Sequence, residues 1–108
     1  MGMVVRGEVH LAALDPTVGA EIQKSRPCLV ISPNEMNQWL RTVIVAPLTS
    51  QGKPASFRIA VKFQGKLGLI LLDQIRVLDK SRLVKKLGII RQPARGSVFA
   101  VLQEMFSD

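Results

Sequence analysis

Arg26, Thr49 and Ser50 are the residues of this 108-residue chain whose types and positions are most suggestive of chemistry. Arg26 begins an apolar run that continues to Ile31, and the two hydroxyl residues follow the apolar run 43–48. A guanidinium presents its N–H donors in a rigid fork that fits phosphate oxygens, and it stays charged, so it is a poor base. Hydroxyls bond phosphate oxygens too, although they also cap turns. If the two runs are neighbouring strands, these side chains indicate a phosphate site.

Few carboxylates accompany these residues. Glu21 is the one nearest to Arg26 in the sequence, and it is either an ion-pair partner that tethers the loop or a candidate general base. Both roles stay open on the sequence alone. Asp73 follows the apolar run 69–72 in the way that the hydroxyl pair follows its own run, so it is a further candidate for the same region.

A metal site is not expected. The chain has one cysteine, Cys28, and one histidine, His10, which are too few for a structural zinc site. The carboxylates are too dispersed to form a cluster for a hard cation. Cys28 lies inside an apolar run, which predicts a buried hydrophobic residue with no disulfide partner in the chain. The sequence therefore predicts a function without a cofactor.

The positive charge is concentrated in the second part of the chain. The net charge is +7, and the part after residue 50 holds eleven basic and four acidic residues, against four of each before it. This excess predicts a polyanionic partner, and a generally cationic surface is the alternative. No apolar run approaches the roughly 20 residues of a membrane span, and the first residues lack the order of a secretion signal. We therefore expect a cytoplasmic protein without membrane contact.

Hydrophobic patterning predicts a single domain, residues 1–108, that is mainly β. Pro93 and the apolar residues after it at helical spacing predict a C-terminal helix, and a short helix is expected before Trp39. Short strands separated by turns predict a strongly bent antiparallel sheet or partly open barrel. The expected strands are 4–12, 26–32, 42–48, 56–63, 69–72 and 82–90.

The same patterning predicts which side chains are buried. In the first strand, Arg6, Glu8 and His10 alternate with apolar residues, so they are expected on an exposed polar face. Trp39, the one indole, is expected to pack against the sheet. Phe57 is expected to point inward from the strand 56–63.

Five segments resemble the MazF/PemK/Kid toxins, and they occur in the family's order over nearly the whole chain. Three of them match the N-terminal signature of that family, including the Arg-Pro motif at Arg26. The other two include the threonine at the end of the third strand and the Asp-Gln pair Asp73-Gln74. The segments are 6–9, 14–21, 26–32, 45–50 and 72–79.

The resemblance implies an SH3-like barrel with a C-terminal helix, usually a homodimer. It implies a metal-independent endoribonuclease that cuts single-stranded RNA, chiefly mRNA, at short sequences. The 2'-hydroxyl attacks the adjacent phosphate and leaves a 2',3'-cyclic phosphate and a 5'-hydroxyl. It also implies a cognate acidic antitoxin, through which the complex binds operator DNA. A flexible acidic peptide is complementary to a basic RNA groove and competes for it.

By resemblance, Arg26 and Thr49 are catalytic. Glu21 is a substrate-binding residue or the base, and the remaining candidates for substrate binding are Ser50, Asp73 and Gln74. This chain departs from the family pattern in two places. Many relatives have glutamine and glycine after the loop glutamate, where this chain has the segment 22–25, so a differently shaped loop is expected. The Kid-like branch has an arginine where this chain has Leu71, so the chemistry is expected to centre on Arg26 and Thr49.

Two other functions remain open. One is a barrel that binds nucleic acid without cutting it, with Arg26 holding a phosphate. The other is inhibition of a DNA topoisomerase, as in the related CcdB branch. That branch lacks the nuclease residues, so the presence of both Arg26 and Thr49 disfavours it.

Overall fold

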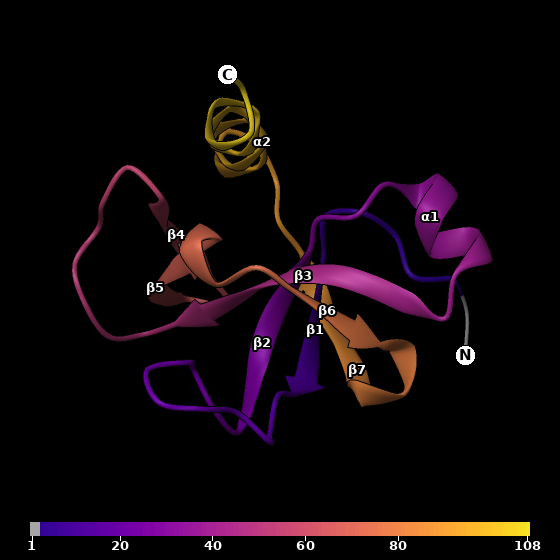
Figure 1. Cartoon of the computed structure of the whole chain (residues 1–108). Helices are drawn as coiled ribbons and strands as arrows, with labels where there is room; N and C mark the ends of the chain where they lie inside the picture. Colours follow the sequence, from indigo (N-terminus) through magenta and orange to yellow (C-terminus); the bar gives the residue numbers. More distant parts are fainter. Residues whose placement is uncertain (1–2) are drawn as a thin grey trace.

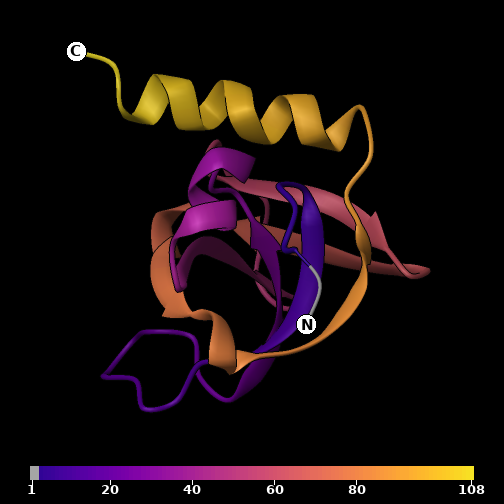
Figure 2. The same cartoon turned by 90° about the vertical axis from the view of Figure 1, so that its right-hand side faces the viewer.

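Seven antiparallel strands form one strongly curled sheet, and a C-terminal helix lies across one end of it (Figure 1, Figure 2). The computed structural model describes residues 3–108. The helices are α1 (Asn34–Trp39) and α2 (Ala94–Met105), with two 3-10 turns, η1 (Leu72–Gln74) and η2 (Lys80–Arg82). None of the helices in residues 3–108 is long and apolar enough to cross a membrane. The strands are β1 (Glu8–Ala13), β2 (Ser25–Val30), β3 (Thr42–Thr49), β4 (Arg58–Phe63), β5 (Lys66–Leu71), β6 (Arg76–Asp79) and β7 (Leu83–Ile89).

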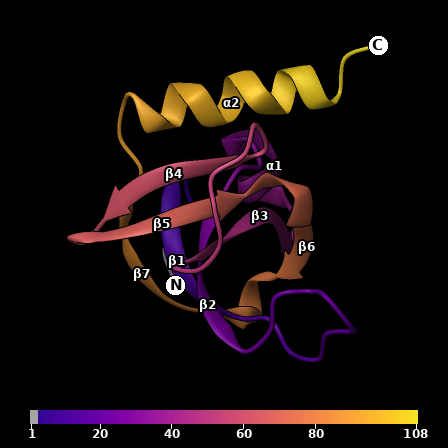
Figure 3. The same ribbon diagram turned by 90° about the vertical axis from the view of Figure 1, so that its left-hand side faces the viewer.

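The order of the strands makes the barrel partly open, which confirms the predicted fold class. The order is β4-β5-β3-β2-β1-β7, and β6 pairs with the first half of β3. The two edge strands, β4 and β7, come close to each other as the sheet curls (Figure 3). Side chains close part of this seam. A Cβ added at Gly88 would lie 3.1 Å from the ring of Phe63, and the Gln64 side-chain amide donates to the Leu87 carbonyl at 3.0 Å.

Two cores lie on opposite faces of the sheet, and the central strands β2 and β3 contribute to both, which explains their continuous apolar runs. One core lies on the α2 side and includes Leu29, Leu48 and Val98. The other, the Cys28 core, lies on the opposite face and includes Cys28 and Val45. Because successive residues of a strand point to opposite faces, β2 and β3 contribute to both cores and need apolar residues at almost every position.

The hairpin between β4 and β5 uses a two-residue turn. Gln64 and Gly65 both have positive φ, 52° and 78°, as a type I′ turn requires. The turn joins the predicted strand 56–63 to the next strand, which begins at Lys66, three residues earlier than expected.

The prediction of an exposed polar face on the first strand is wrong. The strand begins at Glu8, after a turn in which Gly7 has a φ of +95°. Glu8 and His10 are only 7% and 6% exposed. The reason is β7, which pairs with β1 and brings Lys86 Nζ to 2.9 Å from the Glu8 carboxylate. That carboxylate also accepts the Val5 N–H at 2.8 Å and lies 3.1 Å from His10 Nε2.

Two predictions about aromatic residues are also wrong. Trp39 is 75% exposed, because α1 is a short helix that buries only Asn37, whose side chain bonds Ser32. Phe57 is 42% exposed, because β4 begins one residue after it at Arg58. Phe57 thus lies just outside the strand that the sequence pattern assigned to it, whereas Trp39 is the last residue of α1.

Glu8→Gln is expected to destabilise the fold by on the order of 1–2 kcal/mol at neutral pH. Burial alone would raise the pKa of Glu8, but the hydrogen bonds from Lys86, Val5 and His10 outweigh it and hold that pKa below its usual range. The stabilisation is therefore complete above the unfolded pKa of about 4.3 and is lost as the pH falls through the lower folded pKa.

Urea unfolding of both proteins across this pH range measures the effect. The difference in unfolding free energy between wild type and Glu8→Gln should shrink below about pH 4. Glu104→Gln, on the exposed face of α2, is the control and should match wild type throughout. A constant difference at every pH would contradict the ion-pair account.

Cys28 is expected to be unreactive in the folded protein. Its side chain is fully buried, and that burial raises the pKa of the thiol to about 12, so almost no thiolate exists near neutral pH. A thiol-reactive chromophore should label the folded protein only at the rate of unfolding and should label it rapidly in denaturant. Fast labelling of the folded protein would contradict this burial.

Candidate active site

The pairing of β2 with β3 brings Arg26 and Thr49 together. The ladder pairs Cys28 with Pro47 and continues to Val30 with Val45. Carried two residues in the other direction, the same register places Arg26 opposite Thr49. Both then lie on the face of the sheet that carries the Cys28 core. The sequence placed both residues at strand ends, and the register makes them neighbours.

Both residues line two adjoining hollows. The larger has a volume of about 430 Å³, and we call it the Arg26 cleft. The smaller, of about 250 Å³, extends from Thr49 and Ser50 toward the β4–β5 hairpin. The Arg26 cleft is lined by the loop residues Ala20, Glu21, Ile22 and Gln23 and by Arg26, Thr49, Gln51, Gly52, Arg58, Leu71 and Gln74.

Thr49 is held at the end of β3 by a close approach of β5. A Cβ added at Gly68 would lie 3.1 Å from the Thr49 carbonyl oxygen, so glycine allows the two strands to pack tightly here. The Thr49 hydroxyl oxygen accepts the Gln51 N–H at 3.2 Å. Because this bond uses a lone pair, the hydroxyl hydrogen is left to donate to a ligand. Ser50, the next residue, is exposed at the rim of the smaller hollow.

The structure does not pair Arg26 with Glu21. Arg26 is half-buried, and its Nε donates to the Gln23 carbonyl at 3.2 Å. Glu21 is exposed, and its carboxylate accepts the Val18 N–H at 2.7 Å. The ion pairs in residues 3–108 involve neither residue. The tethering role for Arg26 is therefore filled by a backbone carbonyl, and the four guanidinium N–H groups beyond Nε remain for a ligand.

Gln74 holds the loop that departs from the family pattern. Its side-chain oxygen accepts the Ile22 N–H at 2.8 Å across 52 residues of sequence. The Ile22 side chain packs against the Cys28 core. At the other end of the loop, the Asp15 carboxylate accepts the Lys24 N–H at 3.0 Å. Gln74 therefore shapes one wall of the Arg26 cleft, and Ile22 anchors that wall rather than pointing away from it.

Asp73 does not line either hollow. Its carboxylate accepts two hydrogen bonds from Arg58, from Nε at 3.1 Å and from Nη2 at 2.8 Å. These bonds hold the pKa of Asp73 below its usual range, so it is a weak base. Arg58 does line the cleft, and the sequence did not single it out, because alternation along a strand shows only the face on which a residue lies. In the β4–β5 ladder Arg58 lies opposite Leu71, which also lines the cleft, and this pairing is the signal that could have identified Arg58.

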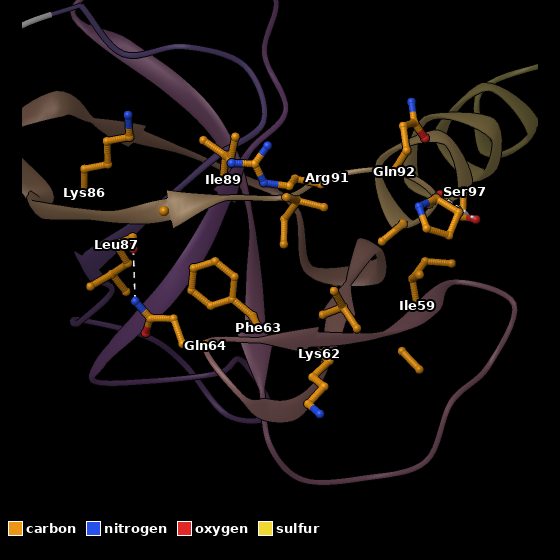
Figure 4. A pocket seen from close by; sticks show the side chains of 16 residues that line it. Ile59, Lys62, Phe63, Gln64, Lys86, Leu87, Ile89, Arg91, Gln92 and Ser97 are labelled. Carbon is orange, nitrogen blue, oxygen red and sulfur yellow. Dashed lines mark hydrogen bonds between the residues drawn. The ribbon is translucent and has the colours of Figure 1, made fainter.

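A larger hollow lies elsewhere, at the seam between β4, β7 and the start of α2 (Figure 4). Its volume is about 810 Å³. Ile59, Phe63 and Leu87 line it together with the basic residues Lys62 and Arg91. None of the candidate site residues lines it, so size alone does not identify the functional site of this protein.

Comparison with known families identifies the family to which this fold belongs. Residues 5–106 match the family described as PemK-like, MazF-like toxin of type II toxin-antitoxin system. The chain belongs to this toxin family. The resemblance inferred from the five sequence segments is thereby confirmed.

Several solved structures are similar to this toxin over nearly its full length. A crystal structure of MazF from Deinococcus radiodurans is 26% identical with a TM-score of 0.85, over 97% of each chain. A MazE-MazF crystal form from the same organism is 26% identical with a TM-score of 0.79, over 97% of this chain and 96% of that chain. An endoribonuclease from mycobacterial species, in complex with its cognate antitoxin, is 22% identical over 94% and 92%, with a TM-score of 0.79. At that identity the likeness concerns the fold.

Gln74→Ala is expected to release the Ile22 amide from its hydrogen bond. A hydrogen bond of this kind contributes about 1 kcal/mol, which corresponds to roughly a fivefold change in local opening. Hydrogen exchange of the toxin should therefore quicken at Ile22 by about that factor and change little in β2. Gln38→Ala, exposed on α1, is the control. Unchanged exchange at Ile22 would contradict the role of Gln74 in holding the loop.

Proposed function

We propose that the toxin is a metal-independent endoribonuclease that cuts single-stranded RNA, chiefly mRNA. The observation that carries this proposal is the convergence of Arg26 and Thr49, from neighbouring strands, on one open cleft. A fixed positive charge and a hydroxyl donor are the groups that a phosphate under attack requires. Family membership and the net charge of +7 support a polyanionic substrate.

In the proposed reaction, the 2'-oxygen of one nucleotide attacks the phosphorus that follows it. A bond forms between the 2'-oxygen and phosphorus, and the bond from phosphorus to the 5'-oxygen breaks. The products are a 2',3'-cyclic phosphate and a 5'-hydroxyl. The 2'-hydroxyl loses its proton to a base, and the departing 5'-oxygen takes a proton from solvent in the open cleft. DNA lacks the 2'-hydroxyl and is not cut.

The residues of the Arg26 cleft divide these tasks. Arg26 stabilises the negative charge that develops on the phosphate oxygens, and Thr49 donates a hydrogen bond to one of them. Glu21 is the one carboxylate among the described residues that line the cleft, so we assign it as the base that accepts the 2'-hydroxyl proton. Asp73 is excluded from this task because its carboxylate is engaged by Arg58. Ser50 contacts RNA at the rim.

We also propose that a cognate acidic antitoxin inhibits the toxin and that the toxin acts as a homodimer. The MazE-MazF crystal structures of Deinococcus radiodurans, at about one-quarter identity, support an antitoxin as partner. A flexible acidic peptide matches the basic surface that RNA would occupy. The resulting complex would bind operator DNA through the antitoxin. These reactions and complexes take place in the cytoplasm.

Arg26→Ala is expected to lower the rate of RNA cleavage by about 10²–10³-fold, and Thr49→Ala by about 10-fold or more. The assay incubates each purified protein with single-stranded RNA in EDTA and labels 5'-hydroxyl ends with a kinase. Arg41→Ala, which removes an exposed arginine outside both hollows, is the control and should cut like wild type.

Each of the two alternative functions predicts a different result in this assay. Binding without cleavage would favour the nucleic-acid-binding barrel. Inactivity toward RNA together with poisoning of a topoisomerase would favour the CcdB-like function. Cleavage by Arg26→Ala at the wild-type rate would overturn the assignment of the active site.

A further inference from the structure

A second arginine, Arg58 of β4, also lines the Arg26 cleft. It is the first residue of β4 and stands opposite Leu71 in the β4–β5 ladder. Two strands, β5 and β3, separate it from β2, which carries Arg26. At about 4.8 Å between neighbouring strands, the two backbones are on the order of 14 Å apart along the sheet. The cleft therefore has one arginine toward each side.

The Asp73 carboxylate orients Arg58 but does not occupy all of its N–H donors. Asp73 accepts from Nε and from Nη2, and the side chains of the pair are each 32% exposed. A guanidinium has five N–H donors, so three remain for another acceptor. A bidentate carboxylate contact fixes the plane of the fork and removes rotamer freedom that a flexible arginine would lose on binding.

We propose that Arg58 is a second phosphate-binding residue of the cleft and that Asp73 is its positioning residue. Arg58 is tied to Asp73 and starts three strands away from Arg26, so it holds a phosphate of a nucleotide next to the cut, not the phosphate under attack. This inference rests on the proposed ribonuclease function. It gives the cleft a direction, with the RNA backbone running from β2 toward β4 across the end of β3.

The number of phosphate contacts can be measured from the salt dependence of binding. For single strands, each neutralised phosphate contributes a slope of about −0.7 to log K against log salt. The probe is a single-stranded RNA dodecamer of random sequence with 2'-O-methyl groups, which cannot be cut. Arg58→Gln should make the slope shallower by about 0.7, Arg58→Lys should keep it, and Arg41→Gln, outside the cleft, should leave it unchanged.

The role of Asp73 is tested by a double-mutant cycle on cleavage of unmodified RNA. At about 0.15 M salt, where the screening length is about 8 Å, Arg58→Gln should raise KM several-fold with little change in kcat. Asp73→Asn should raise KM when Arg58 is present and have no further effect in the Arg58→Gln background. Thermal melts of each variant show whether the fold is kept.

The outcomes separate this inference from the proposed function. A shallower slope for Arg58→Gln in a protein that cuts no RNA would support the phosphate contact and refute the nuclease. Normal cleavage with an unchanged slope and KM in Arg58→Gln would overturn the inference and leave the nuclease intact. A loss of kcat by Asp73→Asn in both backgrounds would overturn the positioning role. No binding of the probe by wild type would overturn both proposals.

Discussion

The hydrogen-bonded register between β2 and β3 is the constraint on which the site depends. It places Arg26 opposite Thr49, near the ends of two strands that contribute buried residues to the cores on both faces of the sheet. A shift of one residue would turn every side chain of β2 to the other face and move Cys28 and Leu29 into the wrong cores. The packing that stabilises the fold therefore also holds the two candidate catalytic groups in place.

The other walls of the cleft are attached to this pair by polar contacts rather than by packing. Gln74 bonds the Ile22 backbone, and Gln23 accepts from Arg26, so the loop between β1 and β2 is held from two directions. The Arg58–Asp73 pair connects the start of β4 with η1. These contacts are exposed or half-buried, so each contributes little to stability, but together they shape a charged cleft on a rigid sheet.

Sequence reasoning predicted the strands well, and it failed where the burial of a side chain depends on a distant partner. The apolar runs at 26–32 and 42–48 identify buried strands, because residues of both faces are apolar. Glu8 was expected to be exposed, since only the pairing with β7 brings Lys86 to it. Arg58 was overlooked for the same reason, as its position depends on β5 and on Asp73. Alternation within a strand shows a face but does not show which strand lies beside it.

The central claim is that Arg26 and Thr49 act on the same phosphate, and a double-mutant cycle on cleavage tests it most directly. If the two residues act as a unit, Arg26→Ala combined with Thr49→Ala should cut RNA about as slowly as Arg26→Ala alone. Single-turnover rates in EDTA, with folding checked by thermal melts, provide the comparison. A double variant whose loss equals the product of the two single losses would show independent sites and contradict the account.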